Sequence, residues 1–130
     1  MSEAGDFRVI FIARDYDATV RFYRDVVEFP VVTAWDDHEP RGTILAAGNG
    51  TIEVFAPAED QTNTFPSGFR LLVEHPDPDS WCARLREKGV DITVALVDRP
   101  WGYREFAVRD PNGIELFFYT VTDPERAGHG

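Results

Sequence analysis

Apolar residues recur along this chain at two spacings: every second residue in several short runs, and every third or fourth residue in two longer ones. The first spacing predicts β-strands and the second predicts amphipathic helices. From Phe7 to Ala13 the odd-numbered residues are all apolar and form one side, and Arg8, Ile10 and Ile12 form the opposite side. We therefore expect a strand at 7–13 whose odd-numbered side packs against a helix.

A helix is expected at 18–27, directly after this strand. Asp15 or Asp17 suits its N-cap, and Pro30 is expected to end it. Turn signals then separate three further runs, and Gly48-Asn49-Gly50 is a hairpin signal. The strands predicted here are 31–35, 43–47 and 51–55. The first half of the chain thus reads as a β-α-β-β-β module.

The second half repeats this order. Asp77-Pro78 predicts a helix start with proline at its first position, and Gly89 stands where a C-terminal cap is expected. A strong turn is predicted at Asp110-Pro111-Asn112-Gly113. The strands predicted around them are 69–74, 91–97, 103–108 and 114–119.

The two halves also share sequence at a fixed offset of 62 residues. Thr51-Ile52-Glu53-Val54-Phe55 reappears as Gly113-Ile114-Glu115-Leu116-Phe117, and Phe7-Arg8-Val9-Ile10 as Phe69-Arg70-Leu71-Leu72. A repeated unit predicts a pseudo-symmetric fold in which Glu53 corresponds to Glu115 and Arg8 to Arg70. We expect one α+β domain over 1–130 that contains two tandem βαβββ modules. Its parts are module one (7–56), a linker (57–66), module two (67–120) and a loose tail (121–130).

The composition narrows the possible partners. A formal net charge of −10 opposes binding to nucleic-acid phosphates and to anionic membranes, and it favours a cationic ligand or simple solubility. Cys82 is the single cysteine, so neither an internal disulfide nor a thiolate zinc cluster is expected. The sequence contains no run long enough to span a membrane and no apolar leader, and we expect a cytoplasmic protein.

Two segments add a family resemblance to this pattern. Val20-Arg21-Phe22-Tyr23 lies in the first helix, and the segment from Pro100 to Gly113 looks like the closing hairpin of bleomycin-resistance-type proteins. With the tandem repeat, the chain resembles the vicinal oxygen chelate superfamily of glyoxalases, bleomycin-resistance proteins and extradiol dioxygenases. The resemblance covers residues 7 to about 120. It implies two curled sheets that form a cleft, usually completed in a homodimer.

Metal-dependent members of that superfamily carry a His or Gln on the first strand and a Glu on the last strand of each module. Here the matching positions hold Arg8 and Glu53 in module one, and Arg70 and Glu115 in module two. Arginine is not a metal ligand, so we expect no metal cofactor; a divalent metal held weakly by the two glutamates is the alternative. We expect each arginine to pair with one of the glutamates instead. The three histidines, His38, His75 and His129, are expected to be solvated.

Aromatic residues supply the rest of the predicted ligand site. Their faces suit planar or cationic molecules. The predicted ligand-binding residues are Arg8, Trp35, Glu53, Phe55, Arg70, Trp101, Tyr103, Glu115 and Phe117. Whether Tyr103 or Arg104 points into the site is left open. Residues assigned to the core instead are Phe7, Val9, Phe11, Phe22, Trp81 and Phe106.

We expect a metal-free protein that binds a small, partly aromatic or cationic molecule, in the manner of bleomycin-resistance proteins, in the cleft or in a dimer groove. The alternative is a metal-dependent glyoxalase, lyase or dioxygenase with unusual ligands. No catalytic residue is assigned, because a carboxylate beside an arginine stays ionised and is a poor base. A third possibility is an accessory domain whose cleft has lost its function.

Overall fold

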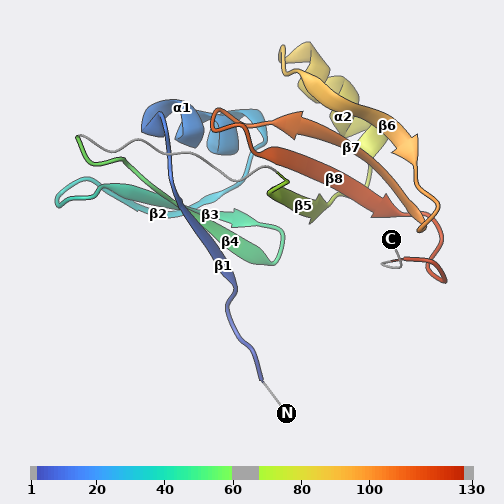
Figure 1. The fold of residues 1–130 in the computed structure, drawn as a ribbon, viewed down its shortest axis with the longest axis horizontal. Helices are drawn as coiled ribbons and strands as arrows, with labels where there is room; N and C mark the ends of the chain where they lie inside the picture. The colour runs from blue at the N-terminus through green and yellow to red at the C-terminus, as the bar shows by residue number, and fades with distance from the viewer. Residues whose placement is uncertain (1–2, 60–67, 128–130) are drawn as a thin grey trace. The chain divides into compact units, whose positions relative to one another are not determined.

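The computed structural model describes residues 3–59 and 68–127. The chain divides into two compact units, Met1–Phe65 and Pro66–Gly130, and each carries one βαβββ module with its helix on one side of a four-stranded sheet (Figure 1). The predicted α+β fold is confirmed. Most of the predicted linker lies outside the described residues, as do His129 and the end of the predicted tail.

Module one forms a mixed sheet with strand order β1-β4-β3-β2. Strands β1 and β4 are parallel, and the other pairs are antiparallel. Its elements are β1 (Arg8–Ile12), α1 (Tyr16–Arg21), η1 (Phe22–Val26), β2 (Val31–Trp35), β3 (Gly42–Ala47) and β4 (Gly50–Phe55). Gly48 has φ 60° in the hairpin between β3 and β4, at the position where a type II′ turn requires glycine.

The first helix differs from the prediction in its second half. Asp15 is the N-cap, since its carboxylate accepts a hydrogen bond from the Ala18 amide at 3.0 Å. After Arg21 the helix widens into the π-helical segment η1, whose first two residues, Phe22 and Tyr23, are both buried. The helix ends before Pro30 is reached, because Glu28 already adopts a left-handed φ of 63°.

Module two forms a mixed sheet with strand order β5-β8-β7-β6. Its first and last strands in the chain, β5 and β8, are again parallel. Its elements are β5 (Arg70–Glu74), α2 (Pro78–Glu87), β6 (Ile92–Asp98), β7 (Tyr103–Arg109) and β8 (Glu115–Val121). Asp77 caps α2 by accepting from the Ser80 amide, and Gly89 follows the helix with φ 83°. In the predicted turn, Asp110 accepts hydrogen bonds from the amides of Asn112 and Ile114 at 2.8 and 2.9 Å.

The start of the predicted loose tail is ordered. Strand β8 runs to Val121, and the amides of Thr122 and Asp123 then both donate to the Gly102 carbonyl, at 2.7 and 3.2 Å. Gly102 has φ 84°, and a Cβ there would come within 2.4 Å of the Asp123 carbonyl oxygen. The prediction of a loose segment from 121 onward is therefore wrong for its first residues, because backbone hydrogen bonds join them to the loop between β6 and β7.

The helix-facing side of each sheet forms the core of its module. In module one, burial on the helix-facing side of β1 increases along the chain. Phe7, just before the strand, is 72% exposed, and Ala13, just after it, is fully buried. The assignment of Phe7 to the core is wrong because Phe7 precedes the strand at the end that the helix does not cover. In module two, Trp81 and Phe106 are buried as expected. No helix within the described residues is long and apolar enough to cross a membrane.

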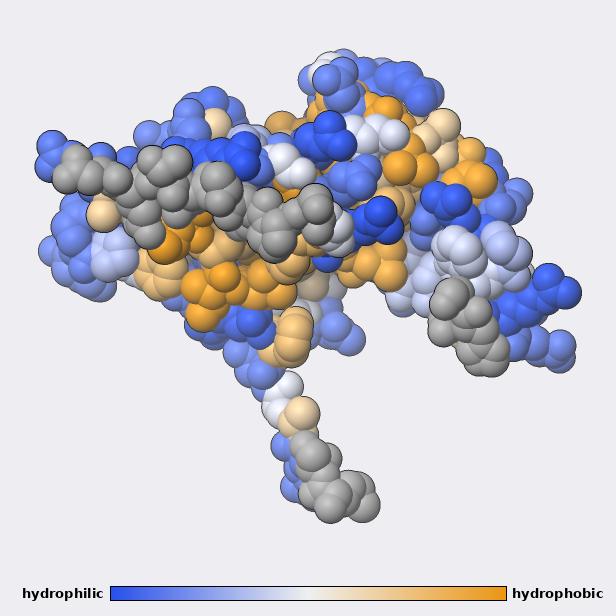
Figure 2. Space-filling view, in the orientation of Figure 1, coloured by the Kyte–Doolittle hydropathy of each residue, from blue (hydrophilic) through white to orange (hydrophobic). Residues whose placement is uncertain are grey.

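Apolar side chains also remain at the surface, visible as orange groups among hydrophilic ones (Figure 2). The large exposed apolar residues lie on or beside three strands, β1, β2 and β5, and are Phe7, Ile10, Val31, Val32, Phe69 and Leu72. All three strands are at the edges of their sheets, where no further strand covers them.

The parallel strand pairs of the two modules differ in register. Arg8 lies opposite Thr51 in module one, and Arg70 lies opposite Glu115 in module two. The 62-residue repeat would place Arg70 opposite Gly113, so the second pair is displaced by two residues. A shift of two keeps every side chain on its own face of the sheet.

Candidate functional site

The predicted ligand residues of module one lie on the face of the sheet that points away from its helix, here called the open face. On it, Arg8 Nη1 donates to Glu53 Oε1 at 2.9 Å and Arg8 Nε donates to Thr51 Oγ1 at 3.2 Å. Glu53 is only 8% exposed, whereas the Arg8 side chain is about one-third exposed. The hydrogen bond to Glu53 raises the pKa of Arg8. Asp6 lies 3.3 Å from the same guanidinium and completes a small ionic cluster.

Trp35 and Phe55 meet on the same open face. Their ring centroids are 5.8 Å apart with the planes at 69°, and the Trp35 indole N–H donates to the Pro40 carbonyl at 2.8 Å. The indole lies directly over Gly42, where a Cβ would come within 2.4 Å of the ring. His38, which was expected to be solvated, is exposed but stacks on Trp35. Gly42 has no side chain, so it leaves room for the Trp35 indole to lie against the sheet.

In module two, the predicted ion pair is present but looser. Arg70 Nε lies 3.8 Å from Glu115 Oε1, and the guanidinium carbon lies 5.7 Å from the centre of the Phe117 ring. Glu115 accepts its hydrogen bond from Thr93, whose hydroxyl lies 3.0 Å from Oε2. The hypothesis that each arginine pairs with a glutamate is therefore confirmed, with both partners in the same module. The sequence did not indicate Thr93.

The orientation that the sequence left open is now settled. Tyr103 lies on the open face and stacks on Tyr119, with the ring centroids 4.4 Å apart, because the two follow the same alternation on neighbouring strands. Arg104 lies on the helix side, where Nε and Nη2 donate to Asp79 at 2.8 and 3.0 Å. The pKa of Tyr119 is raised, first by burial and then by the nearby Glu74 carboxylate.

Trp101 has a partner that the sequence analysis missed. The guanidinium of Arg99 lies 5.4 Å from the centre of the Trp101 rings, and its Nε donates to Glu105 at 3.1 Å. Glu105 is 5% exposed and points to the same open face as Tyr103. Continued alternation along this strand would have identified Glu105, whereas nothing in the local pattern indicates Arg99.

His75 corrects a second expectation. It is half-buried and stacks on Trp81 with ring centroids 5.4 Å apart and planes at 5°. Burial lowers its pKa, against the opposing effect of Asp77.

Among residues 3–59 and 68–127, no three His, Cys, Asp or Glu side chains are grouped so that they could hold a metal ion.

A pocket of about 490 Å³ lies elsewhere in module one, between the helix and strands β2 and β3. Of the nine predicted ligand residues, it includes only Trp35, at its edge. The sequence therefore did not indicate this pocket, whose other residues come from the helix, from β2 and β3, and from the loop between these two strands.

Comparison with known families agrees with the fold and the repeat. The family model described as "Glyoxalase/Bleomycin resistance protein/Dioxygenase superfamily" matches residues 7–118. The chain belongs to this superfamily. No curated protein matches the sequence at a significant level.

Solved structures of other proteins share the fold over nearly their whole length. TioX from Micromonospora sp. ML1 is 25% identical with a TM-score of 0.72, and the match covers 91% of this chain and 99% of TioX. TnmS3, an antibiotic binding protein from Streptomyces sp. CB03234, is 23% identical with a TM-score of 0.73, covering 93% and 98%. Lactoylglutathione lyase from Agrobacterium tumefaciens is 19% identical with a TM-score of 0.70, covering 92% and 95%. Because one fold serves a binding protein and an enzyme, only the site residues can separate these functions.

Proposed function

We propose that this superfamily member is a small-molecule-binding protein of the bleomycin-resistance type that works without a metal. The observation that carries the proposal is the hydrogen bond of 2.9 Å between Arg8 Nη1 and Glu53 Oε1. In metal-dependent members of this superfamily, the first-strand position of the metal site holds a His or a Gln. Here a guanidinium stands there and donates to the carboxylate that would otherwise bind the metal.

The donor groups at these positions do not suit a divalent cation. A metal-binding carboxylate must offer its oxygen lone pairs, and Oε1 of Glu53 already accepts a hydrogen bond from a permanently charged group. Glu115 has Arg70 at 3.8 Å and a hydrogen bond from Thr93. A divalent ion placed next to either arginine would also be repelled by it.

The aromatic residues favour a planar or cationic ligand. Trp35 with Phe55, and Tyr103 with Tyr119, each present paired rings on an open face. Aromatic faces bind planar molecules by stacking and cations through the ring quadrupole, and the net charge of −10 attracts cations. The antibiotic binding protein TnmS3 shares the fold and supports this choice. The proposal includes a cytoplasmic location. It also includes a homodimer, which size-exclusion chromatography with light scattering would test.

Elemental analysis of the purified protein tests the metal-free part, together with thermal shifts in Ni²⁺, Zn²⁺, Mn²⁺ and Fe²⁺. We expect substoichiometric metal and no ion-specific stabilisation. The Glu53→Gln variant is the matched control, since it removes one carboxylate and should leave the metal response unchanged. Stoichiometric metal in the wild type that this variant loses would overturn the proposal and favour a metal-dependent glyoxalase or dioxygenase.

Fluorescence titration tests the ligand part, with acridine orange as a planar aromatic cation and fluorescein as an anionic dye of similar size. The titration is run at physiological salt, because an acidic protein attracts any cation at low salt. We expect saturable binding of the cation that Tyr119→Leu weakens and that Phe7→Leu, at an exposed position, leaves unchanged. Equal binding of both dyes, or no effect of Tyr119→Leu, would contradict this assignment.

A further inference from the structure

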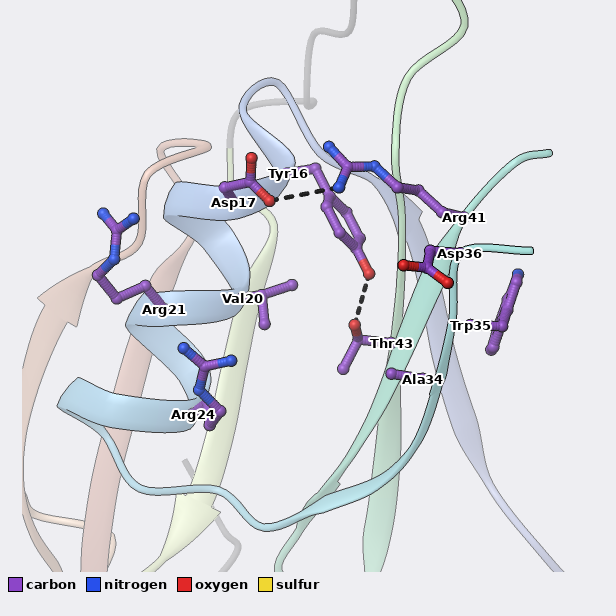
Figure 3. Close-up of a pocket in the computed structure, with 10 residues that line it drawn as sticks. All are labelled: Tyr16, Asp17, Val20, Arg21, Arg24, Ala34, Trp35, Asp36, Arg41 and Thr43. Carbon is purple, nitrogen blue, oxygen red and sulfur yellow. Dashed lines mark hydrogen bonds and ion pairs between the residues drawn. The ribbon is translucent and has the colours of Figure 1, made fainter. Parts of the chain in front are cut away.

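The pocket of module one opens on the helix side of the sheet and shares only Trp35 with the proposed ligand site. It lies between α1 with η1 on one side and strands β2 and β3 on the other, with a volume of about 490 Å³ (Figure 3). Strand β2 is the edge of the sheet, and all but its last residue are exposed. The helix therefore leaves this corner of the sheet uncovered, and the volume is in the range of about 300–1,000 Å³ that small-molecule pockets occupy.

The pocket is built from side chains that hold one another in place. The Tyr16 hydroxyl and the Thr43 hydroxyl are hydrogen-bonded at 2.5 Å, which ties the helix to β3. The Arg41 guanidinium covers the Tyr16 ring at 4.6 Å and lies 3.5 Å from Asp17. Val20 adds an apolar surface beside Tyr16 and Thr43 (Figure 3). A ligand would meet a surface that is already formed, which reduces the entropy lost on binding.

Among the described residues, two charged groups around the pocket lack a counter-charge. Arg41 faces Asp17, and Arg24 donates to Asp25 through Nε and Nη2 at 2.8 and 2.9 Å. Within the part of the chain that the structure describes, Arg21 and Asp36 have no ion-pair partner. Arg21 is on the helix wall and Asp36 on the strand wall, where its carboxylate points into the pocket (Figure 3).

We propose that this pocket binds a small zwitterion, a peptide of two or three residues with free ends. Its carboxylate would lie against Arg21, with Arg24 beside it, because guanidinium groups bind carboxylates through paired hydrogen bonds. Its ammonium group would lie against Asp36, and an apolar side chain would cover Val20. Two opposite charges on opposite walls select a molecule whose own charges are separated, and they disfavour a simple anion or cation.

Two-dimensional NMR titration with Gly-Leu-Gly at millimolar concentrations tests the proposal. We expect saturable shifts of the Val20 and Ala34 amides. N-acetylation or C-amidation of the peptide should each weaken binding by about fivefold, since each removes one partly exposed ion pair. In Arg21→Gln, amidation should have no further effect, and in Asp36→Asn, acetylation should have none. Arg126→Gln, another exposed arginine, is the control and should bind as the wild type does.

The substituted side chains are exposed, so both variants are expected to keep the wild-type spectrum in the absence of peptide. No shift at saturating peptide would overturn the proposal. Equal binding of the capped and free peptides would overturn it too, as would shifts confined to open-face residues such as Glu53 and Phe55. None of these outcomes bears on the dye titration, so this proposal and the proposed function can fail independently.

Discussion

The two modules start from the same repeated residues, yet their arginines contact the equivalent glutamates at different distances. Arg8 meets Glu53 at 2.9 Å, whereas Arg70 is 3.8 Å from Glu115 and extends over Phe117. The register explains the difference. In both modules the guanidinium reaches about two residues forward along the neighbouring strand; that position holds Glu53 in module one and Phe117 in module two.

The comparison teaches that equivalent residues need not make equivalent contacts. A displacement of two residues keeps the core face intact but changes which side chains meet on the open face. As a result, module one carries a half-buried ionic cluster, and module two carries an arginine that is 62% exposed over an aromatic ring. The repeat alone predicts a symmetric pair of sites, and the structure provides two different ones.

The modules also differ in how they fill the space under the helix. Module one uses the aromatic group around Tyr23, which contacts Phe11, Phe22 and Phe29. Module two places Phe118 at the centre, between Trp81 and Phe106. In the first group the central ring comes from the helical segment η1, and in the second the central ring comes from strand β8.

The largest expected effect comes from removing the central ring of module two. Phe118 is 2% exposed, so Phe118→Ala should lower the free energy of unfolding by about 3–5 kcal/mol. Urea unfolding followed by tryptophan fluorescence measures this. Phe7→Ala, at a residue 72% exposed, is the matched control and should change stability little. Similar losses for both variants would show that Phe118 is not the centre of the core.

Neutralising each glutamate in turn should show how much each of the two ion pairs contributes to stability. Glu53→Gln replaces a buried acceptor of a charged hydrogen bond and should lower the melting temperature by roughly 3–6 °C. Glu115→Gln should cost less than half of that, because Glu115 is more exposed and its ion pair is longer. Differential scanning calorimetry of both variants gives the comparison. Equal losses would mean that the register difference has no energetic consequence.

Acid should weaken module two through a group that module one lacks. Burial lowers the pKa of His75, and the repeat places Ala13 at the matching position. Protons therefore bind His75 more readily in the unfolded chain, so stability is complete above the unfolded pKa of about 6.5 and is lost as pH falls through the lower folded pKa. The melting temperature should drop between neutral and mildly acidic buffer, and His75→Gln should reduce that drop. An unchanged drop in the variant would exclude His75 as its cause.

The smallest effect is expected at the surface ion pairs that join each helix to its sheet. Arg104 has Asp79 at 2.8 Å and Asp98 at 3.3 Å, whereas Arg41 has Asp17 at 3.5 Å. Arg104→Gln should lower the melting temperature by roughly 1–2 °C, and Arg41→Gln by less, since exposed pairs contribute little. High salt should reduce the difference between the two variants. A larger loss for Arg41→Gln would reverse this assignment.

Most of the fold could be predicted from the sequence, because alternation and turn residues are local signals. The strand at 31–35, the caps Asp15 and Asp77, and the turn at Asp110 all follow from neighbours in the chain. The same holds for the faces of the strands, which bring Arg8 to Glu53. Phe7 was misassigned because alternation says which side a residue faces, not how far the helix extends over it.

Contacts between distant segments could not be predicted in the same way. The two-residue displacement between the modules has no local signature, because it depends on how strands far apart in the chain pair with each other. The pocket next to α1 depends on how far the helix covers β2, which is set by packing. The π-helical segment is a similar case, since Phe22 and Tyr23 also fit an ordinary helix by spacing.

The loop that carries Trp101 has a kinetic consequence. The Arg99 amide donates to Tyr103, the Gly102 amide donates to Arg99, and two amides after β8 donate to the Gly102 carbonyl. A turn fastened on both sides has little conformational freedom left to lose when a molecule stacks on its indole. Different molecules should therefore bind there with similar association rate constants, and their dissociation rate constants should account for the differences in affinity.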